Sequence, residues 1–173
     1  ADGAPVVTES WERWNDYGIG MFRKGAYRQA EEAFRQVAAF DRPEGPLNLA
    51  RVFIDEGRLD EAVSALQEAA RKGAYPWSVA WFSALVDMQN GEFDAAIDGF
   101  LSLFTTQFNE ARERGFDFSL NYRLRNKLAQ AYFEKSKISK DERRWLKMSE
   151  EHYRAAAELD PENVTAHYGL TQV

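Results

Sequence analysis

The chain has 173 residues, of which 45% are hydrophobic and 29% charged, a balance typical of a protein with a packed core. Its formal charge of −6 argues against nucleic acid as a partner and against attraction of the whole molecule to anionic membranes. The sequence has no cysteine, which excludes disulfides, thiolate zinc sites and covalent haem attachment within this chain. No stretch approaches the roughly 20 apolar residues of a membrane-spanning helix, so we expect no membrane insertion.

The first ten residues, ADGAPVVTES, lack an initiator methionine and the apolar run of a signal peptide. We therefore expect residues 1–10 to be an N-terminal tail, and the chain to be a piece of a larger protein.

From residue 11 onward the sequence repeats itself. GAYRQAEEAF at 25–34 returns as GRLDEAVSAL at 57–66 and as GEFDAAIDGF at 91–100. Each copy begins with a glycine and carries an alanine and a large apolar residue at fixed distances, and apolar residues with helical spacing precede each glycine. The sequence thus predicts units of two helices, in which the glycine ends the first helix. The aligned positions are Gly25, Gly57 and Gly91, then Ala30, Ala62 and Ala96, then Phe34, Leu66 and Phe100.

A period near 34 residues and the pattern W-x2-L-G-x2-Y…A-x3-F…P are typical of tetratricopeptide repeats. The first unit carries Trp14, Tyr17, Gly18 and Met21 at the corresponding places, so the sequence resembles the tetratricopeptide repeat family. The resemblance implies an all-α fold, an α-solenoid of helix-turn-helix repeats that forms a right-handed superhelix with a concave groove. We expect a single domain over 11–173, with repeats at approximately 11–42, 43–76, 77–110 and 122–163 and a partial repeat at 164–173.

The fourth repeat carries an insertion of about eight residues around KSKISKDERRWLK, 135–147. This segment has an excess of positive charge and allows two interpretations. It is either a docking patch for an acidic segment or a neighbouring domain, or a solvated loop that leads into an extended helix. In the second case Ser139 and Glu142 form a capping box, and Trp145 packs. Its cations are Lys135, Lys137, Lys140, Arg143, Arg144 and Lys147, beside the acidic Asp141 and Glu142.

Residues with catalytic chemistry are few. His167 replaces the motif tryptophan and is expected to pack, whereas His152 is expected to be solvated. Neighbouring carboxylates on one helix point about 100° apart and cannot converge on one substrate atom. We therefore expect a solvated acidic face, no catalytic residue, no metal, no cofactor and no enzymatic activity. The carboxylate pairs are Glu31 and Glu32, Asp60 and Glu61, and Glu150 and Glu151.

In tetratricopeptide proteins the first helices line a concave surface that holds a peptide or a helix of a partner. On each first helix, the residues beside the packed positions are therefore expected to line this groove. They include aromatic anchors, and amide and guanidinium groups that can hydrogen-bond a peptide backbone. The nominated residues are Asn15, Ile19, Phe22, Arg23, Leu47, Arg51, Ile54, Trp81, Leu85, Met88, Gln89, Asn126, Gln130, Phe133 and Tyr168.

The leading hypothesis is a non-catalytic interaction module that binds a protein or peptide in this groove. The alternative is an assembly domain, which forms homo-oligomers through the C-terminal end or docks to a neighbouring domain. The C-terminal repeat is incomplete, so we expect exposed apolar surface at Ala156, Leu159 and Leu170.

The runs PWSVAWFSALVDMQNGEFDAAI and LDPENVTAHYGL also resemble tetratricopeptide regions of bacterial exported proteins, including multihaem cytochrome-like ones. That resemblance implies a redox domain as the neighbour and a periplasmic location, with the cytoplasm as the alternative.

Overall fold

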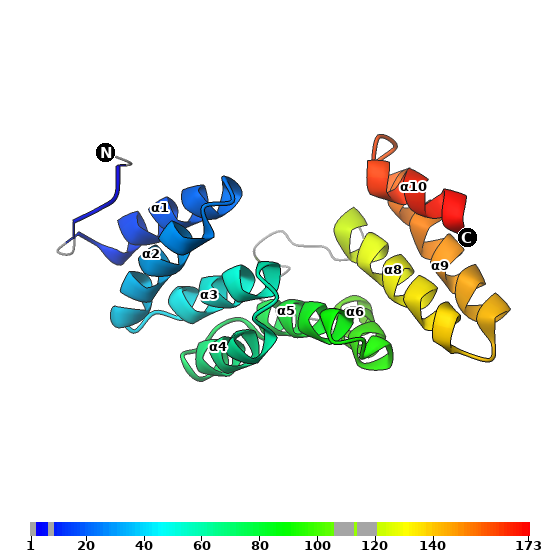
Figure 1. Ribbon diagram of the computed structural model, residues 1–173, viewed down its shortest axis with the longest axis horizontal. Coiled ribbons are helices and arrows are strands. Elements are labelled where there is room, and N and C mark those ends of the chain that lie inside the picture. The colour runs from blue at the N-terminus through cyan, green and yellow to red at the C-terminus, as the bar shows by residue number, and fades with distance from the viewer. Residues whose placement is uncertain (1–2, 7–8, 106–112, 114–120) are drawn as a thin grey trace. The chain divides into compact units, whose positions relative to one another are not determined.

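The computed structural model describes residues 3–6, 9–105, 113 and 121–173, and all regular secondary structure among them is helical (Figure 1). This confirms the predicted all-α class. The chain divides into two compact units, Ala1–Val86 and Asp87–Val173, referred to below as unit 1 and unit 2. The predicted third repeat, 77–110, ends outside the described residues.

Unit 1 is built from consecutive helical hairpins. Helix α1 packs against α2, α2 against α3, and α3 against α4, so each helix contacts its neighbours in the chain. The central core cluster joins α1 to α4 with Phe82, Leu85 and Val86 of α5. The helices are α1 (Trp11–Arg23), α2 (Tyr27–Ala39), α3 (Glu44–Asp55), α4 (Leu59–Arg71) and α5 (Pro76–Gln89), the last of which continues into unit 2.

Unit 2 is dominated by the hairpin of α8 and α9, with α6 packed on α8 and α10 packed on both helices of the hairpin. Helices α8 and α9 have 17 and 18 residues, against 13 in each of α1 and α2. The insertion therefore lengthens both helices and leaves only a short turn between them. The helices are α6 (Phe93–Thr105), α8 (Tyr122–Ile138), α9 (Glu142–Leu159) and α10 (Val164–Gln172).

The repeated glycines end the first helices, as predicted. Gly25, Gly57 and Gly91 have φ of 75°, 73° and 77°, in the left-handed region that side chains disfavour. After Gly25, the backbone N–H of Ala26 bonds the carbonyl of Met21 at 2.9 Å, which closes the helix with a Schellman motif.

The repeated alanines are fully buried, as expected of small residues between packed helices. Ala30, Ala62 and Ala96 are each 0% exposed. The motif glycine Gly18 has a similar role, since a Cβ there would lie 2.6 Å from the ring of the buried Phe34. Small residues thus let α1 and α2 pack around one large ring.

Asn163 caps α10, because its Oδ1 accepts a hydrogen bond from Ala166 N at 2.8 Å. The predicted start of α9 is wrong. Ser139 and Glu142 do not form a capping box, since α9 begins after Asp141 and Ser139 Oγ instead accepts from Trp145 Nε1 at 2.9 Å.

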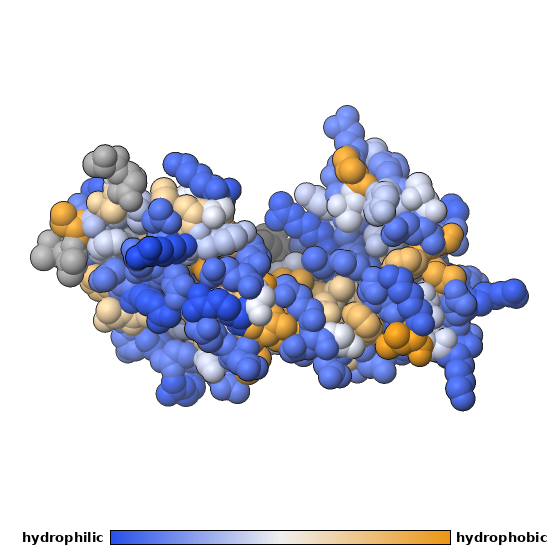
Figure 2. Space-filling view, in the orientation of Figure 1, coloured by the Kyte–Doolittle hydropathy of each residue, from blue (hydrophilic) through white to orange (hydrophobic). Residues whose placement is uncertain are grey.

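The surface seen in Figure 2 is mostly hydrophilic, with hydrophobic residues in small separate groups. Among the described residues, no helix combines the length and apolar character needed to cross a membrane.

Candidate interaction surfaces

Four predicted groove residues of unit 1 form a continuous group with Asn48 on α1 and α3. The group is called here the first-helix surface: Asn15, Ile19, Phe22, Asn48 and Arg51. Asn48 Nδ2 donates to Asn15 Oδ1 at 2.8 Å and joins the two helices. Arg51 Nη1 lies 3.5 Å from Asn48 Oδ1 and extends this polar chain along α3. Asn48 is 8% exposed and is the member of this surface that the stripe pattern of the sequence did not predict.

Arg51 also lies over aromatic rings. Its guanidinium carbon is 5.0 Å from the centroid of Phe22 on α1 and 5.9 Å from that of Phe82 on α5. Arg51 therefore links three successive first helices and is held in place by polar and ring contacts. The space beneath it, lined with Ile19, Phe22 and Phe34, does not admit a water-sized molecule.

Other nominated residues of unit 1 and α5 differ in how much surface they offer. Ile54 is 4% exposed and belongs to the core, so it has little surface for a partner. Leu47 and Leu85 are partly buried against the same core. The remaining nominated residues have more surface: Arg23 and Gln89 are exposed, and Trp81 and Met88 are half-buried.

In unit 2, the nominated Asn126 is a buried residue. It is 8% exposed, its Nδ2 donates to Asn163 Oδ1 at 2.9 Å, and its Oδ1 has no hydrogen-bond partner. Gln130 is exposed, Phe133 is half-buried beneath Lys137, and Tyr168 is 64% exposed.

Both histidine expectations are wrong. His152 is 8% exposed and stacks on Tyr132 with ring centroids 5.6 Å apart. Its Nδ1 lies 3.3 Å from Arg125 Nη1, and burial together with this cation lowers the pKa of His152 to about 4. His167 is exposed, with Nε2 2.6 Å from the carbonyl oxygen of Pro161.

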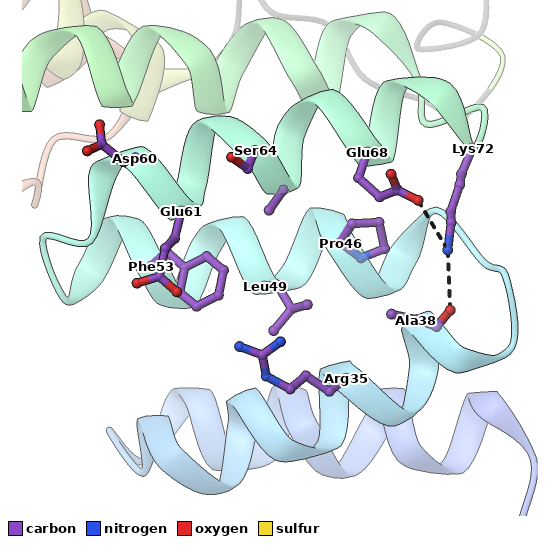
Figure 3. Close-up of a pocket in the computed structure, with 11 residues that line it drawn as sticks. Arg35, Ala38, Pro46, Leu49, Phe53, Asp60, Glu61, Ser64, Glu68 and Lys72 are labelled. Atoms are coloured by element: carbon purple, nitrogen blue, oxygen red, sulfur yellow. Dashed lines mark hydrogen bonds and ion pairs between the residues drawn. The ribbon is translucent and has the colours of Figure 1, made fainter.

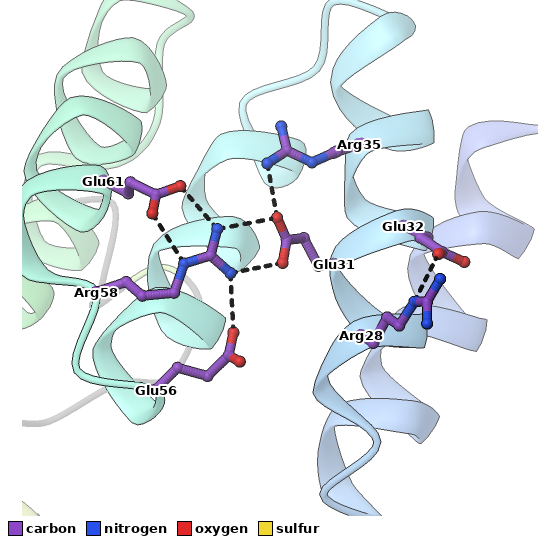
Figure 4. A network of polar contacts seen from close by, with 7 residues as sticks. All are labelled: Arg28, Glu31, Glu32, Arg35, Glu56, Arg58 and Glu61. Carbon is purple, nitrogen blue, oxygen red and sulfur yellow. Dashed lines mark hydrogen bonds and ion pairs between the residues drawn. The ribbon is translucent and has the colours of Figure 1, made fainter.

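The acidic pairs are also not uniformly solvated. Arg58 binds Glu31 on α2 and Glu61 on α4, each with a shortest N–O distance of 2.7 Å (Figure 4). Hydrogen bonds from Arg58 lower the pKa of both carboxyl groups. Glu32 instead pairs with Arg28 along α2, at 3.5 Å. These contacts are structural, because each carboxylate is neutralised by arginine.

The sequence did not reveal a pocket of about 490 Å³ between α2, α3 and α4 (Figure 3). Pro46, Leu49 and Phe53, spaced along one side of α3, form its apolar floor. Lys72 lies at one end, where Nζ donates to the carbonyl of Ala38 at 3.3 Å. The floor residues also occupy core positions, so helical spacing alone could not identify them as pocket residues.

The C-terminal end is less exposed than expected. Ala156 is 0% exposed and Leu170 packs against the cluster that contains it, because α10 covers this part of α9. Leu159 is 37% exposed. The described residues contain no group of three or more side chains suited to hold a metal ion.

Comparisons with solved structures show the same fold in MamA proteins. MamA from Desulfovibrio magneticus RS-1 superposes with a TM-score of 0.64 at 14% identity, covering 95% of this chain and 84% of that one. MamA of strain MSR-1 gives 0.60 at 19% identity, covering 94% and 83%. A search of curated protein sequences gave no significant match.

The resemblance to multihaem cytochrome-like proteins gains no support from these matches. The helical-repeat architecture is that of protein-protein interaction and scaffold modules. A family model, that of the protein kinase G tetratricopeptide repeat, matches residues 19–173. The chain therefore belongs to this tetratricopeptide repeat family.

Proposed function

We propose that the chain is a non-catalytic module that binds a segment of a partner protein along the first-helix surface of unit 1. The observation that supports this most directly is the polar chain of Asn15, Asn48 and Arg51, which runs from α1 to α3 beside Ile19 and Phe22. Polar groups in a half-buried apolar setting are what recognition of a peptide backbone requires.

Each group has a role that follows from its chemistry. The asparagine amides carry both donors and acceptors, as does each residue of an extended peptide. Arg51 donates only, and its contacts with Asn48 and Phe22 hold the side chain near one orientation. This arrangement reduces the entropy lost on binding. Ile19 and Phe22 supply apolar contact for alternate side chains of the bound segment.

Further contacts are proposed at nominated residues outside this group. Trp81 and Met88 on α5 and Gln130 and Phe133 on α8 have surface available for a partner. Asn126 is proposed as a support for the start of α10 through Asn163, rather than as a direct contact.

The test begins with selection of peptides from a random displayed library on the wild-type chain. Selected peptides are then titrated by calorimetry against the variant Phe22→Ala with Arg51→Gln. We expect at least about tenfold weaker binding, because an aromatic anchor and a guanidinium are both lost. The control is Arg71→Gln, an exposed cation on α4 whose loss leaves the first-helix surface intact. Equal affinity of the selected peptides for all three proteins would exclude this surface as the site.

Assembly through α10 is the alternative function. Val164 and Tyr168 are 79% and 64% exposed on this helix, which favours burial against a second copy. Sedimentation velocity over a range of concentrations tests it. Self-association that disappears in the variant Val164→Ser with Tyr168→Ser would support the assembly role, whereas a monomer at all concentrations would reject it.

A further inference from the structure

The inserted segment of unit 2 contains two kinds of cation. Lys135 pairs with Asp94 on α6 and lies 3.8 Å from the centroid of the Trp145 ring. Lys137 pairs with Glu134 at 2.9 Å. These two lysines therefore belong to the packing of α8. The other four cations lie in the turn and in the first two turns of α9, and together they are called here the basic face: Lys140, Arg143, Arg144 and Lys147.

The basic face points away from the core. At about 100° per residue, its three helical positions, Arg143, Arg144 and Lys147, fall within one side of α9. The buried Ser149, His152 and Tyr153 fall on the opposite side. All four cations are exposed. The face extends over eight residues, 140–147, or roughly 10 Å at the rise of a helix.

These cations have no carboxylate partner among the described residues. Arg144 only stacks on Trp145, with its guanidinium carbon 4.6 Å from the ring centroid. By contrast, Arg154, two turns further along α9, pairs with Glu150 at 2.6 Å. The lack of partners is therefore a property of this end of α9.

Stability of the helix does not explain their position. Cations at a helix N-terminus face the positive end of the helix dipole, which is the less favourable end for them. The N-cap residue Asp141 makes no side-chain capping bond that would offset this. Arg143 and Arg144 instead add to a positive potential that the dipole already creates.

We propose that the basic face binds an acidic segment of a protein, laid along the exposed side of α9, with Ile138 as an apolar contact at the turn. Two arginines in successive positions suit bidentate pairing with carboxylates. Ile138, the last residue of α8 and two positions before Lys140, is 74% exposed and can cover an apolar side chain of the segment. This site lies on a different unit from the first-helix surface, so it goes beyond the function proposed above.

Two other anionic partners fit less well. A lipid surface that approaches the turn would meet the exposed carboxylates of Asp141 and Glu142 beside Ile138. A nucleic acid would be repelled by a chain with a charge of −6, and four cations over about 10 Å contact few phosphates. A segment lying along α9 contacts the cations of the helix, and only its end at Ile138 comes near the two carboxylates.

The experiment measures fluorescence anisotropy of a labelled peptide with four glutamates and one leucine, mixed with the full chain. The test variant is Arg143→Gln, Arg144→Gln and Lys147→Gln, in which glutamine preserves helix propensity. The matched control removes three exposed cations of unit 1 and has the same net charge: Lys24→Gln, Arg28→Gln and Arg71→Gln. We expect at least about tenfold weaker binding in the test variant and less than about twofold in the control.

Ile138→Ser separates the apolar contact from charge, and we expect it to weaken binding even at high salt, where ion pairs are screened. An equal loss of peptide affinity in both triple variants would mean that binding depends only on the net charge of the chain, and it would overturn the proposal. Tighter binding to phosphatidylglycerol vesicles or to duplex DNA than to the peptide would also overturn it. We expect the acidic peptide to bind equally well to the variant Phe22→Ala with Arg51→Gln, because the basic face does not depend on the first-helix surface.

Discussion

Arg58, in the turn between α3 and α4, holds both carboxylate oxygens of Glu31 on α2, at N–O distances of 2.7 and 3.3 Å. The same guanidinium bonds Glu56 and Glu61, so it connects the second helices of two successive repeats (Figure 4). Removal of Arg58 would leave three carboxylates close together without their common cation.

We expect Arg58→Gln to lower the melting temperature at pH 7. The pKa values of Glu31 and Glu61 are lowered in the folded state by Arg58, so this stabilisation is present above their ordinary pKa and is lost as the pH falls through the lowered values. The decrease in melting temperature from pH 7 to pH 3 should therefore be smaller in Arg58→Gln than in the wild type. Thermal melts followed by circular dichroism measure this, with Arg71→Gln as the control. The same acid sensitivity in Arg58→Gln and wild type would show that the network contributes nothing.

His152 should produce a second pH dependence at higher pH. Its pKa is about 4 in the folded protein against an ordinary 6.5, so between these values the unfolded chain binds more protons. Stability should therefore fall as the pH is lowered from about 6.5 to about 4. We expect His152→Phe, which keeps an aromatic ring against Tyr132, to flatten the profile in this window. His167→Gln is the comparison for the loss of an exposed imidazole. Titration of the two imidazoles by NMR gives an independent measurement.

Gly18 and Gly20 on α1 should respond in opposite directions to alanine. A Cβ at Gly18 would lie 2.6 Å from Phe34, whereas one at Gly20 would have no atom within 4 Å. We expect Gly18→Ala to cost about 1–3 kcal/mol through overpacking and Gly20→Ala to stabilise by about 0.5–1 kcal/mol through helix propensity. Urea unfolding of the two variants decides the point. Equal effects would mean that the contact of α1 with Phe34 is looser than described.

Asn163 should be the side chain that fixes the start of α10. Its Oδ1 accepts from Ala166 N and from Asn126 Nδ2, so Asn163→Ala removes a cap and leaves a buried amide unpaired. We expect a loss of about 1–2 kcal/mol in the free energy of unfolding. Asp160→Ala serves as the comparison and should change stability by less than about 0.5 kcal/mol. If Asp160→Ala proves the more damaging, Asn163 is not the residue that fixes the start of α10.

The repeat period made most of the local architecture predictable. Gly25, Ala30 and Phe34 recur at equivalent positions because each repeat has the same turn and the same packing between its helices. The glycine adopts the left-handed backbone of the turn, and the alanine and phenylalanine are buried between helices. The family model that matches residues 19–173 confirms this interpretation.

Features that depend on residues distant in the sequence were not predictable. His152 is buried because Tyr132 and Arg125, 20 and 27 positions earlier, pack against it. Glu31 is neutralised by Arg58, which lies outside its own repeat. Helical spacing identifies which residues share one side of a helix, but it does not identify which residue of the next helix each of them contacts.

The contact between Glu31 and Arg58 has a further consequence for how repeats could be exchanged. With Gly25 and Gly57 at equivalent positions, the first repeat has Ala26 where the second has Arg58, and the second has Val63 where the first has Glu31. Tandem copies of either repeat alone would therefore lack one half of the ion pair at every junction. The two repeats are complementary modules with a fixed order, and duplication or shuffling within this chain would break the junction that Arg58 forms.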